Sequence, residues 1–140
     1  MLSIYLNFDG DCREAFEFYR TVFGGEFAVL ETFRNMPPGE VSMQEDELDK
    51  VMHVSYPIGS SVLMGSDVPS GFGPPHVSGN NFSVSVSPES REDANRIFGA
   101  LSEGGNVTMD LQDMFWGSYF GSCTDRFGVN WQVNCEQAQG

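Results

Sequence analysis

Basic residues are scarce in this sequence, and long apolar runs are missing. Seven Lys and Arg stand against 20 Asp and Glu, which gives a net charge of −13. Such a charge repels the phosphates of nucleic acids and anionic membrane surfaces. No apolar run reaches the length of about eighteen residues that a membrane helix needs, and the first residues lack the basic and apolar regions of a signal peptide. We therefore expect a cytoplasmic protein with neither a nucleic-acid nor a membrane partner.

Cysteine is also rare. The three cysteines, Cys12, Cys123 and Cys135, are an odd number without a CxxC spacing. Neither a disulfide framework nor a thiolate zinc site is indicated. Cys12 stands where a helix is expected to begin, but the acidic Asp11 and Glu14 beside it oppose a reactive thiolate. We expect no redox role for it.

The composition favours one folded domain rich in strands and turns. The chain has 140 residues, of which 40% are hydrophobic, and it includes 12 Phe, 4 Tyr and 16 Gly. This length supports a single core or two small halves packed together, but not two ordinary domains. Many glycines between short apolar runs are typical of strands joined by turns.

The two halves of the sequence predict the same order of elements. Each has a strand, a helix with one apolar face, a Gly-Gly pair and three further strands. The expected strands are 3–8, 26–34, 51–56 and 61–66, then 81–87, 106–111, 116–124 and 129–134, and the expected helices begin at about residues 11 and 89. We predict an α+β fold, a single domain of residues 1–140. It would hold two tandem βαβββ modules, about 1–66 and 80–136, joined by the Pro- and Gly-rich connector 67–79.

The last predicted hairpin places a polar row on one face of a strand. Its turn, residues 125–128, begins with an Asp that can bond its own backbone and ends with a Gly that can take a positive φ. Because side chains alternate along a strand, Asn130, Gln132 and Asn134 share one face, while Trp131 and Val133 share the other. The polar row faces either water or a ligand cavity.

Several segments together resemble a known family. They are Tyr5-Leu6-Asn7-Phe8-Asp9-Gly10, Glu14 to Tyr19, Met52-His53-Val54, Leu63 to Asp67, Phe115-Trp116-Gly117 and Thr124 to Trp131. In this combination the chain resembles the PhnB-like branch of the vicinal oxygen chelate superfamily, which includes glyoxalase I, bleomycin-resistance proteins and extradiol dioxygenases. The resemblance implies a curved, mostly antiparallel sheet of two modules around a cavity that takes a small-molecule ligand, commonly in a homodimer.

The resemblance also implies four metal-ligand positions, which this sequence fills with unsuitable residues. They fall at about Ser3, Met64, Asn81 and Gln132. None is a histidine or a carboxylate, the side chains that suit a catalytic divalent ion. We therefore expect no cofactor, and a divalent metal held by displaced ligands stays as the disfavoured alternative.

Other residues are candidates for the pocket. The set expected to line it is Tyr5, Asn7, His53, Met64, Asn81, Trp116 and Gln132. His53 could act as a base or an isolated metal ligand, or it could be a structural histidine bonded to a neighbouring strand. The aromatic residues Phe115, Trp116, Tyr119 and Phe120 could stack on a ligand, although some of them must face the core. The carboxylates Glu31, Asp110 and Asp113 are candidate acids or bases, with a solvated surface role as the alternative, and His76 lies in the connector.

Three functions follow as hypotheses. The first is a small-molecule-binding protein without the metal, and the second is an enzyme of the lyase, isomerase or dioxygenase type that uses His53. A scaffold with a filled interior is the third. Some members of the branch carry a methyltransferase label, but a nucleotide-type cofactor favours glycines before a helix, and the Gly pairs here follow the helices.

Overall fold

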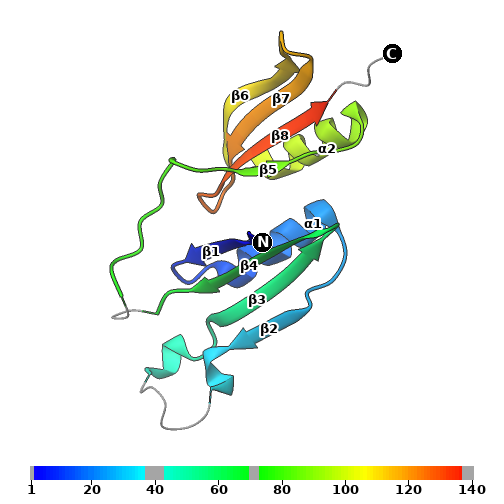
Figure 1. Cartoon of the computed structure of the whole chain (residues 1–140). Coiled ribbons are helices and arrows are strands. Elements are labelled where there is room, and N and C mark those ends of the chain that lie inside the picture. The colour runs from blue at the N-terminus through cyan, green and yellow to red at the C-terminus, as the bar shows by residue number, and fades with distance from the viewer. Residues whose placement is uncertain (1, 37–42, 70–72, 137–140) are drawn as a thin grey trace. The chain divides into compact units, whose positions relative to one another are not determined.

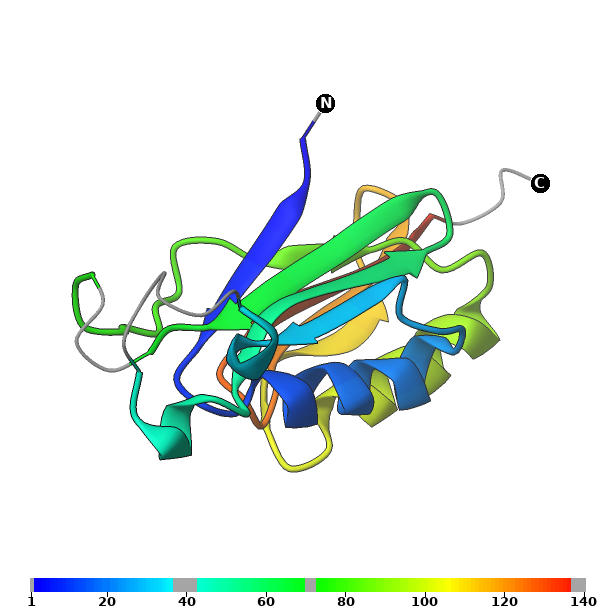
Figure 2. The same cartoon turned by 90° about the horizontal axis from the view of Figure 1, so that it is seen from below.

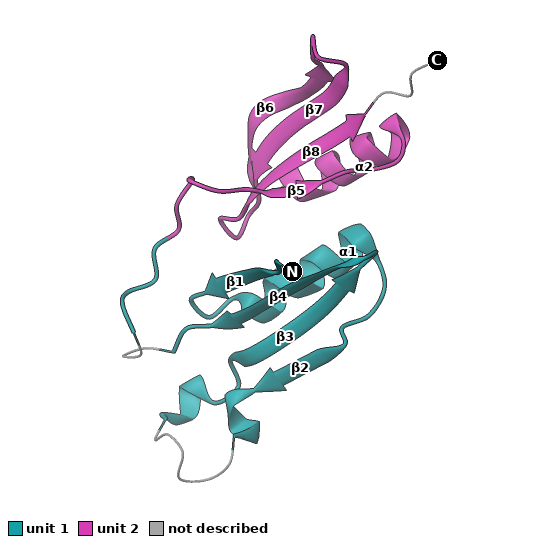
Figure 3. Cartoon of the chain, in the orientation of Figure 1, with its two compact units in different colours: residues 1–77 teal, residues 78–140 magenta. Residues whose placement is uncertain are grey.

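The computed structural model describes residues 2–36, 43–69 and 73–136. It separates into two compact units, Met1–Val77 and Ser78–Gly140, which Figure 3 shows in different colours. Each unit has its own sheet and its own helix, so each is described by itself. Neither helix in the described part of the chain has the length and hydropathy needed to cross a bilayer.

Unit 1 contains one long helix and four strands (Figure 1). In chain order the elements are β1 (Ile4–Phe8), α1 (Cys12–Phe23), β2 (Val29–Thr32), the short 3-10 helices Phe33–Asn35 and Glu45–Glu47, β3 (Val51–Ile58) and β4 (Ser61–Asp67). The strand order in the sheet is β1-β4-β3-β2. The strand β1 pairs with β4 in parallel, and the other two pairs are antiparallel.

Unit 2 repeats this topology. Its elements are β5 (Val84–Val86), α2 (Arg91–Ser102), β6 (Asn106–Asp113), β7 (Ser118–Thr124) and β8 (Asn130–Glu136). The strand order is β5-β8-β7-β6, again with one parallel pair, β5 with β8, and two antiparallel pairs. The predicted α+β class and the internal βαβββ repeat are confirmed, as two four-stranded, mostly antiparallel sheets.

In each unit the helix covers one face of the sheet, and alternate strand residues pack beneath it. Figure 2 shows α1 and α2 running along their sheets. In unit 1 the buried strand residues are Leu6, Phe8, Val51, Val54, Tyr56 and Leu63, and in unit 2 they include Trp131, Val133 and Cys135. The residues between them face away from the helix, because neighbouring strand residues point to opposite sides.

Close packing in unit 1 also depends on a glycine in β4. A Cβ built on Gly65 would lie 2.7 Å from the Phe16 ring and 3.0 Å from the carbonyl oxygen of Leu6. No side chain fits at this distance, so only glycine allows α1 to approach β4 this closely.

The start of α1 is held in a way that the sequence did not reveal. The spacing of Asp11 and Glu14 predicts a side-chain cap, but Asp11 makes no such bond. Instead, the buried carboxylate of Asp67, at the end of β4, accepts hydrogen bonds from the backbone N–H groups of Gly10 (2.9 Å), Cys12 (3.0 Å) and Val51 (2.9 Å). A carboxylate at a helix N-terminus satisfies free N–H groups and complements the helix dipole.

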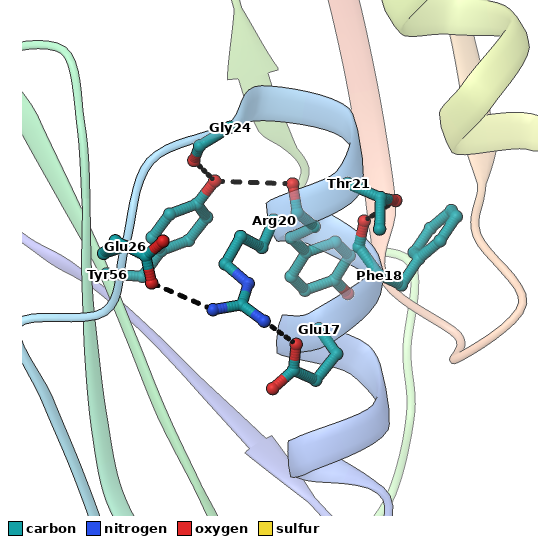
Figure 4. A network of polar contacts seen from close by, with 8 residues as sticks. Glu17, Phe18, Arg20, Thr21, Gly24, Glu26 and Tyr56 are labelled. Carbon is teal, nitrogen blue, oxygen red and sulfur yellow. Dashed lines mark hydrogen bonds and ion pairs between the residues drawn. The ribbon is translucent and has the colours of Figure 1, made fainter.

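The end of α1 is tied to β3 by a polar network (Figure 4). The hydroxyl of Tyr56 donates to the carbonyl oxygen of Gly24, with the carbonyl of Tyr19 3.5 Å away. On the solvent side, Arg20 forms ion pairs with Glu17 (2.6 Å) and Glu26 (3.0 Å). The Tyr56 bond at the end of α1 and the Asp67 bonds at its start together fix the helix against the sheet.

In unit 2 a helix and a turn are each capped by a nearby side chain. Ser90 precedes α2 and its hydroxyl accepts from the backbone N–H of Asp93 at 3.1 Å. In the β7–β8 turn, Asp125 accepts from the N–H groups of Phe127 (2.8 Å) and Val129 (3.1 Å), and Gly128 has a φ of 89°. The second carboxylate oxygen of Asp125 accepts a hydrogen bond from the indole N–H of Trp131 at 2.8 Å. The predicted turn is confirmed and also anchors the core tryptophan.

Several predicted boundaries were wrong. The strand expected at 81–87 forms only at Val84–Val86, and the one expected at 26–34 is limited to Val29–Thr32 before a 3-10 turn. Trp116 lies in the turn before β7 instead of in the strand. The pairing of Thr32 with Val51 and of Glu31 with His53 leaves Met52 as an extra residue in β3. This bulge places Val51 on the buried face, whereas the sequence predicts that it shares a face with His53.

Candidate functional site

The face of the first sheet opposite α1 carries most of the predicted pocket residues of unit 1. The strand register aligns Tyr5 of β1 with Met64 of β4, Met64 with Ser55 of β3, and Ser55 with Val29 of β2. A second pair on this face joins Asn7 and Ser66. Tyr5 is 44% exposed and Val29 is 39% exposed. This row of side chains is therefore an accessible surface made of phenol, thioether, hydroxyl and aliphatic groups.

Tyr5 and His53 form a pair on this face. Their rings stack with centroids 5.9 Å apart and planes inclined by 20°, and the Tyr5 hydroxyl lies 3.4 Å from Nδ1 of His53. Glu31, the cross-strand partner of His53, accepts a hydrogen bond from the side chain of Asn35 at 3.2 Å. The structure thus brings the phenol of β1 and the imidazole of β3 together across β4, and it aligns the carboxylate of Glu31 on β2 with this imidazole.

The corresponding face of the second sheet is a row of amides and hydroxyls. Gln132 of β8 is aligned with Ser85 of β5 on one side and with Ser122 of β7 on the other. The Ser122 hydroxyl bonds the Thr108 hydroxyl at 2.7 Å. Asn130 also belongs to this row; its amide donates to the carbonyl oxygen of Gly79 at 2.8 Å and accepts from Thr124 at 2.8 Å. The predicted polar face of the last strand is confirmed, because Trp131, Val133 and Cys135 are the buried alternates.

Asn134 differs from the other members of this row. Its side-chain oxygen is buried and has no hydrogen-bond partner among the described residues. The residue is aligned with Phe120 of β7. Buried amide oxygens are nearly always bonded, so this atom is an exception among the described residues.

The predicted aromatic residues separate into two groups. Tyr119 faces α2, where its hydroxyl donates to Asn95 at 2.6 Å and the guanidinium of Arg91 lies 3.9 Å from its ring centre. Trp116 stands edge-on to Phe115 at 5.0 Å and to Phe120 at 6.4 Å. Trp116 is 54% exposed and Phe115 is 97% exposed. The accessible aromatic group is therefore Phe115, Trp116 and Phe120.

The four positions implied by the resemblance offer side chains that suit a divalent ion poorly. Ser3 precedes β1 and Asn81 precedes β5, so neither lies in a strand. The residues aligned with Met64 and Gln132 across the parallel pairs are Tyr5 and Ser85. A thioether, a phenol, an amide and a hydroxyl are poor ligands for a catalytic divalent ion. Within the described ranges no three His, Cys, Asp or Glu side chains come together as a metal-binding group.

The remaining candidates are engaged elsewhere. Asp113 forms an ion pair with Arg91 at 2.5 Å, and Asp110 is exposed on β6. The Nε2 atom of His76 lies 3.0 Å from the backbone carbonyl oxygen of Asn7. Cys12 is fully buried, and burial together with the charge of Asp67 raises the pKa of its thiol, so it is not a reactive thiolate.

Sequence reasoning did not select several members of these two faces. Val29, Ser55, Ser66, Ser85 and Ser122 become candidates only through the strand register, and Thr108 through its hydrogen bond to Ser122. Their alternation with buried residues is visible in the sequence, but the register of a parallel pair between distant strands is not, because no turn fixes it.

Comparisons with known proteins agree with this fold and these motifs. The model of a family described as 3-demethylubiquinone-9 3-methyltransferase matches residues 1–134. YjdN of Escherichia coli K12 is 30% identical over 146 residues, covering 99% of this chain and 97% of that protein.

Solved structures extend the likeness. The protein PA1353 of Pseudomonas aeruginosa is 41% identical, with a TM-score of 0.86 over 98% of this chain and 99% of that one. The PhnB protein of Bacillus cereus shares the fold with a TM-score of 0.75 at 23% identity, over 96% and 98% of the two chains. Members of the glyoxalase and bleomycin-resistance group share it at lower identity. The chain therefore belongs to the family that carries the 3-demethylubiquinone-9 3-methyltransferase description, and it shares the fold of the PhnB and glyoxalase-like structures.

Proposed function

We propose that this protein binds a small molecule on the sheet faces that its helices leave uncovered, without the divalent metal of its superfamily. The observation that carries the proposal is the chemistry of the two central rows. Where the superfamily would hold a metal, the rows present Tyr5 with Met64 in one unit and Ser85 with Gln132 in the other. Aromatic rings beside a few polar groups are typical of small-molecule sites.

A binding screen tests this proposal directly. The chain has two tryptophans, of which Trp131 is buried and Trp116 is exposed beside Phe120. Titration with a metabolite library should produce a saturable change in tryptophan fluorescence for at least one compound. The matched variants Trp116→Phe and Trp131→Phe separate the two signals, and we expect Trp116 to be the reporter. Absence of any saturable ligand would count against the proposal.

Metal content provides the second test. We expect purified protein to contain less than stoichiometric amounts of first-row transition metals, because the donor set suits them poorly. A stoichiometric metal that disappears in His53→Ala would overturn the metal-free proposal and favour an enzyme in which His53 is a metal ligand.

The alternative is an enzyme in which His53 is a general base. The Tyr5 hydroxyl, 3.4 Å from Nδ1 of His53, favours it, because a hydrogen-bonding partner orients the imidazole of a general base. Once a ligand is known, its turnover can be followed with His53→Gln and Tyr5→Phe. If the native protein turns the ligand over and these variants bind it without turnover, the enzyme is established. If the native protein binds the ligand without turnover, the binding role stands.

We do not propose the methyltransferase activity that the family description names. The loop that leads into α1 contains one glycine, and the loop that leads into α2 contains none. The Gly pairs 24–25 and 104–105 follow the helices instead. Nucleotide-type cofactors favour glycines before a helix. We expect no saturable binding of S-adenosylmethionine. The homodimer and the cytoplasmic location stay predictions, and the first can be measured by sedimentation.

A further inference from the structure

The uncovered sheet faces contain neither lysine nor arginine. Among the strands that the structure describes, none includes a Lys or an Arg. We infer that the ligand carries no net negative charge: the site selects uncharged aromatic molecules with hydrogen-bonding groups and rejects carboxylated, phosphorylated or sulfonated ones. This inference rests on the proposed function and names the class of ligand that it requires.

All seven basic residues of the chain lie outside the strands. Four are on the helices, which cover the opposite faces of the sheets, and three are in connections; they are Arg13, Arg20, Arg91 and Arg96, then Arg34, Lys50 and Arg126. An anionic group on an uncovered face therefore finds no basic residue in the sheet beneath it.

Most of these cations are also held by acidic or carbonyl partners. Arg34 pairs with Asp49 and Glu45, Lys50 pairs with Glu47, and Arg91 pairs with Asp113. Arg126 donates twice to the carbonyl oxygen of Glu103, just after α2. Recruiting one of them to a ligand would require breaking a contact that the fold already makes.

The groups that do line the faces suit a different ligand. They offer hydroxyl and amide groups as donors and acceptors, and aromatic rings from Tyr5 and Trp116 for stacking. An ionised carboxylate or sulfonate group supplies only acceptors, so it cannot donate to the amide and hydroxyl oxygens of these faces. Glu31, opposite His53 on β2, adds a negative charge beside the first face. With a net charge of −13, the whole protein also repels an approaching anion.

Two fluorescent probes that differ by one sulfonate test the inference. N-phenylnaphthylamine is uncharged, and anilinonaphthalene sulfonate has the same aromatic frame with one negative charge. We titrate both into the native chain at low ionic strength and about pH 8, where imidazoles are ordinarily neutral. The uncharged probe should bind saturably and at least about tenfold more tightly than the sulfonate.

Matched variants assign the effect to the sheet faces. Ser55→Lys and Ser122→Lys each place a cation on one uncovered face, and at least one should tighten sulfonate binding about tenfold with little effect on the uncharged probe. Thr21→Lys makes the same change of net charge on the exposed side of α1 and should have no such effect. Circular dichroism confirms folding, and the comparison on the native chain requires no variant.

The outcomes separate the two proposals. Equal or tighter binding of the sulfonate by the native chain would overturn the charge selection while leaving a binding protein. An equal gain in Thr21→Lys would also overturn it, because net charge and not the sheet face would then be responsible. Absence of saturable binding of the uncharged probe would overturn the inferred ligand class, whereas the proposed function fails only if the metabolite library also produces no saturable ligand.

Discussion

Asp67 connects three segments of unit 1 through a single carboxylate. It is 2% exposed and accepts from the backbone of Gly10, Cys12 and Val51. In Asp67→Asn, one oxygen is replaced by an NH₂ group that faces an N–H donor. We expect the free energy of unfolding to fall by about 2 kcal/mol or more, measured by urea denaturation. The control Asp9→Asn changes an exposed neighbour, and equal midpoints for the two variants would contradict the role of Asp67.

Two asparagines on the same face of β8 should respond in opposite ways to the same substitution. Asn134→Val removes a buried oxygen without a partner and should stabilise the protein by about 1 kcal/mol. Asn130→Val removes bonds to Gly79 and Thr124 and should destabilise it by a similar amount. Urea midpoints measure both effects. An Asn134→Val variant that is less stable than the native chain would argue against an unpaired oxygen at this position.

Because of the buried thiol of Cys123, we expect the free energy of unfolding to depend on pH in the alkaline range. Burial, with a contribution from Asp125, raises the pKa of this thiol to about 11 from an ordinary value of 9.0. The folded chain then holds this proton more tightly than the unfolded chain. The stabilisation is complete below about pH 9 and is lost as the pH rises toward about 11.

The measurement is a series of urea midpoints across this range. Cys123→Ala should be less stable than the native chain at every pH. Between about pH 9 and about pH 11, however, it should lose less stability than the native chain does. Val133→Ala creates a comparable space in the same core without removing a thiol and should retain the native slope. A slope unchanged in Cys123→Ala would show that this thiol does not contribute.

At the scale of elements, substitutions at two glycines test how closely α1 packs on β4 and how much a glycine weakens α2. Gly65→Ala in β4 places a methyl group against the Phe16 ring and should destabilise unit 1 by about 1 to 3 kcal/mol. Gly99→Ala lies on the exposed side of α2, where nothing comes within 4 Å, and should stabilise by about 0.5 to 1 kcal/mol. Thermal unfolding followed by circular dichroism measures both, and a neutral Gly65→Ala would refute the close approach of α1.

The elements themselves were largely predictable because their signals are local. Helical periodicity indicated α1 and α2, and the turn at residues 125–128 indicated the β7–β8 hairpin. The cap of α1 was not predictable, because its carboxylate comes from Asp67, 55 residues away from Cys12. The bulge at Met52 was likewise hidden, since it depends on pairing with β2. Local propensity cannot report a partner that only the folded sheet brings near.

At the scale of the whole molecule, the repeat and the family motifs gave the fold class, whereas the site followed only in part. The face that carries Tyr5 and His53 was expected, and their pairing was not, because it requires the register of three strands. The row of Ser85, Gln132 and Ser122 depends in the same way on two pairings. Alternation indicates which residues share a face, and only the register indicates which ones meet.

The parallel pairing of β1 with β4 has a consequence for the folding of unit 1. The antiparallel strands β2, β3 and β4 are close in sequence and can associate early, whereas β1 must wait for a partner that ends at Asp67. Closing this long loop is the slow, entropically costly step. During synthesis, the first sheet can therefore be completed only after β4 has left the ribosome, which precedes the emergence of β5. A chain arrested before that point would expose the edge of β4 and tend to aggregate.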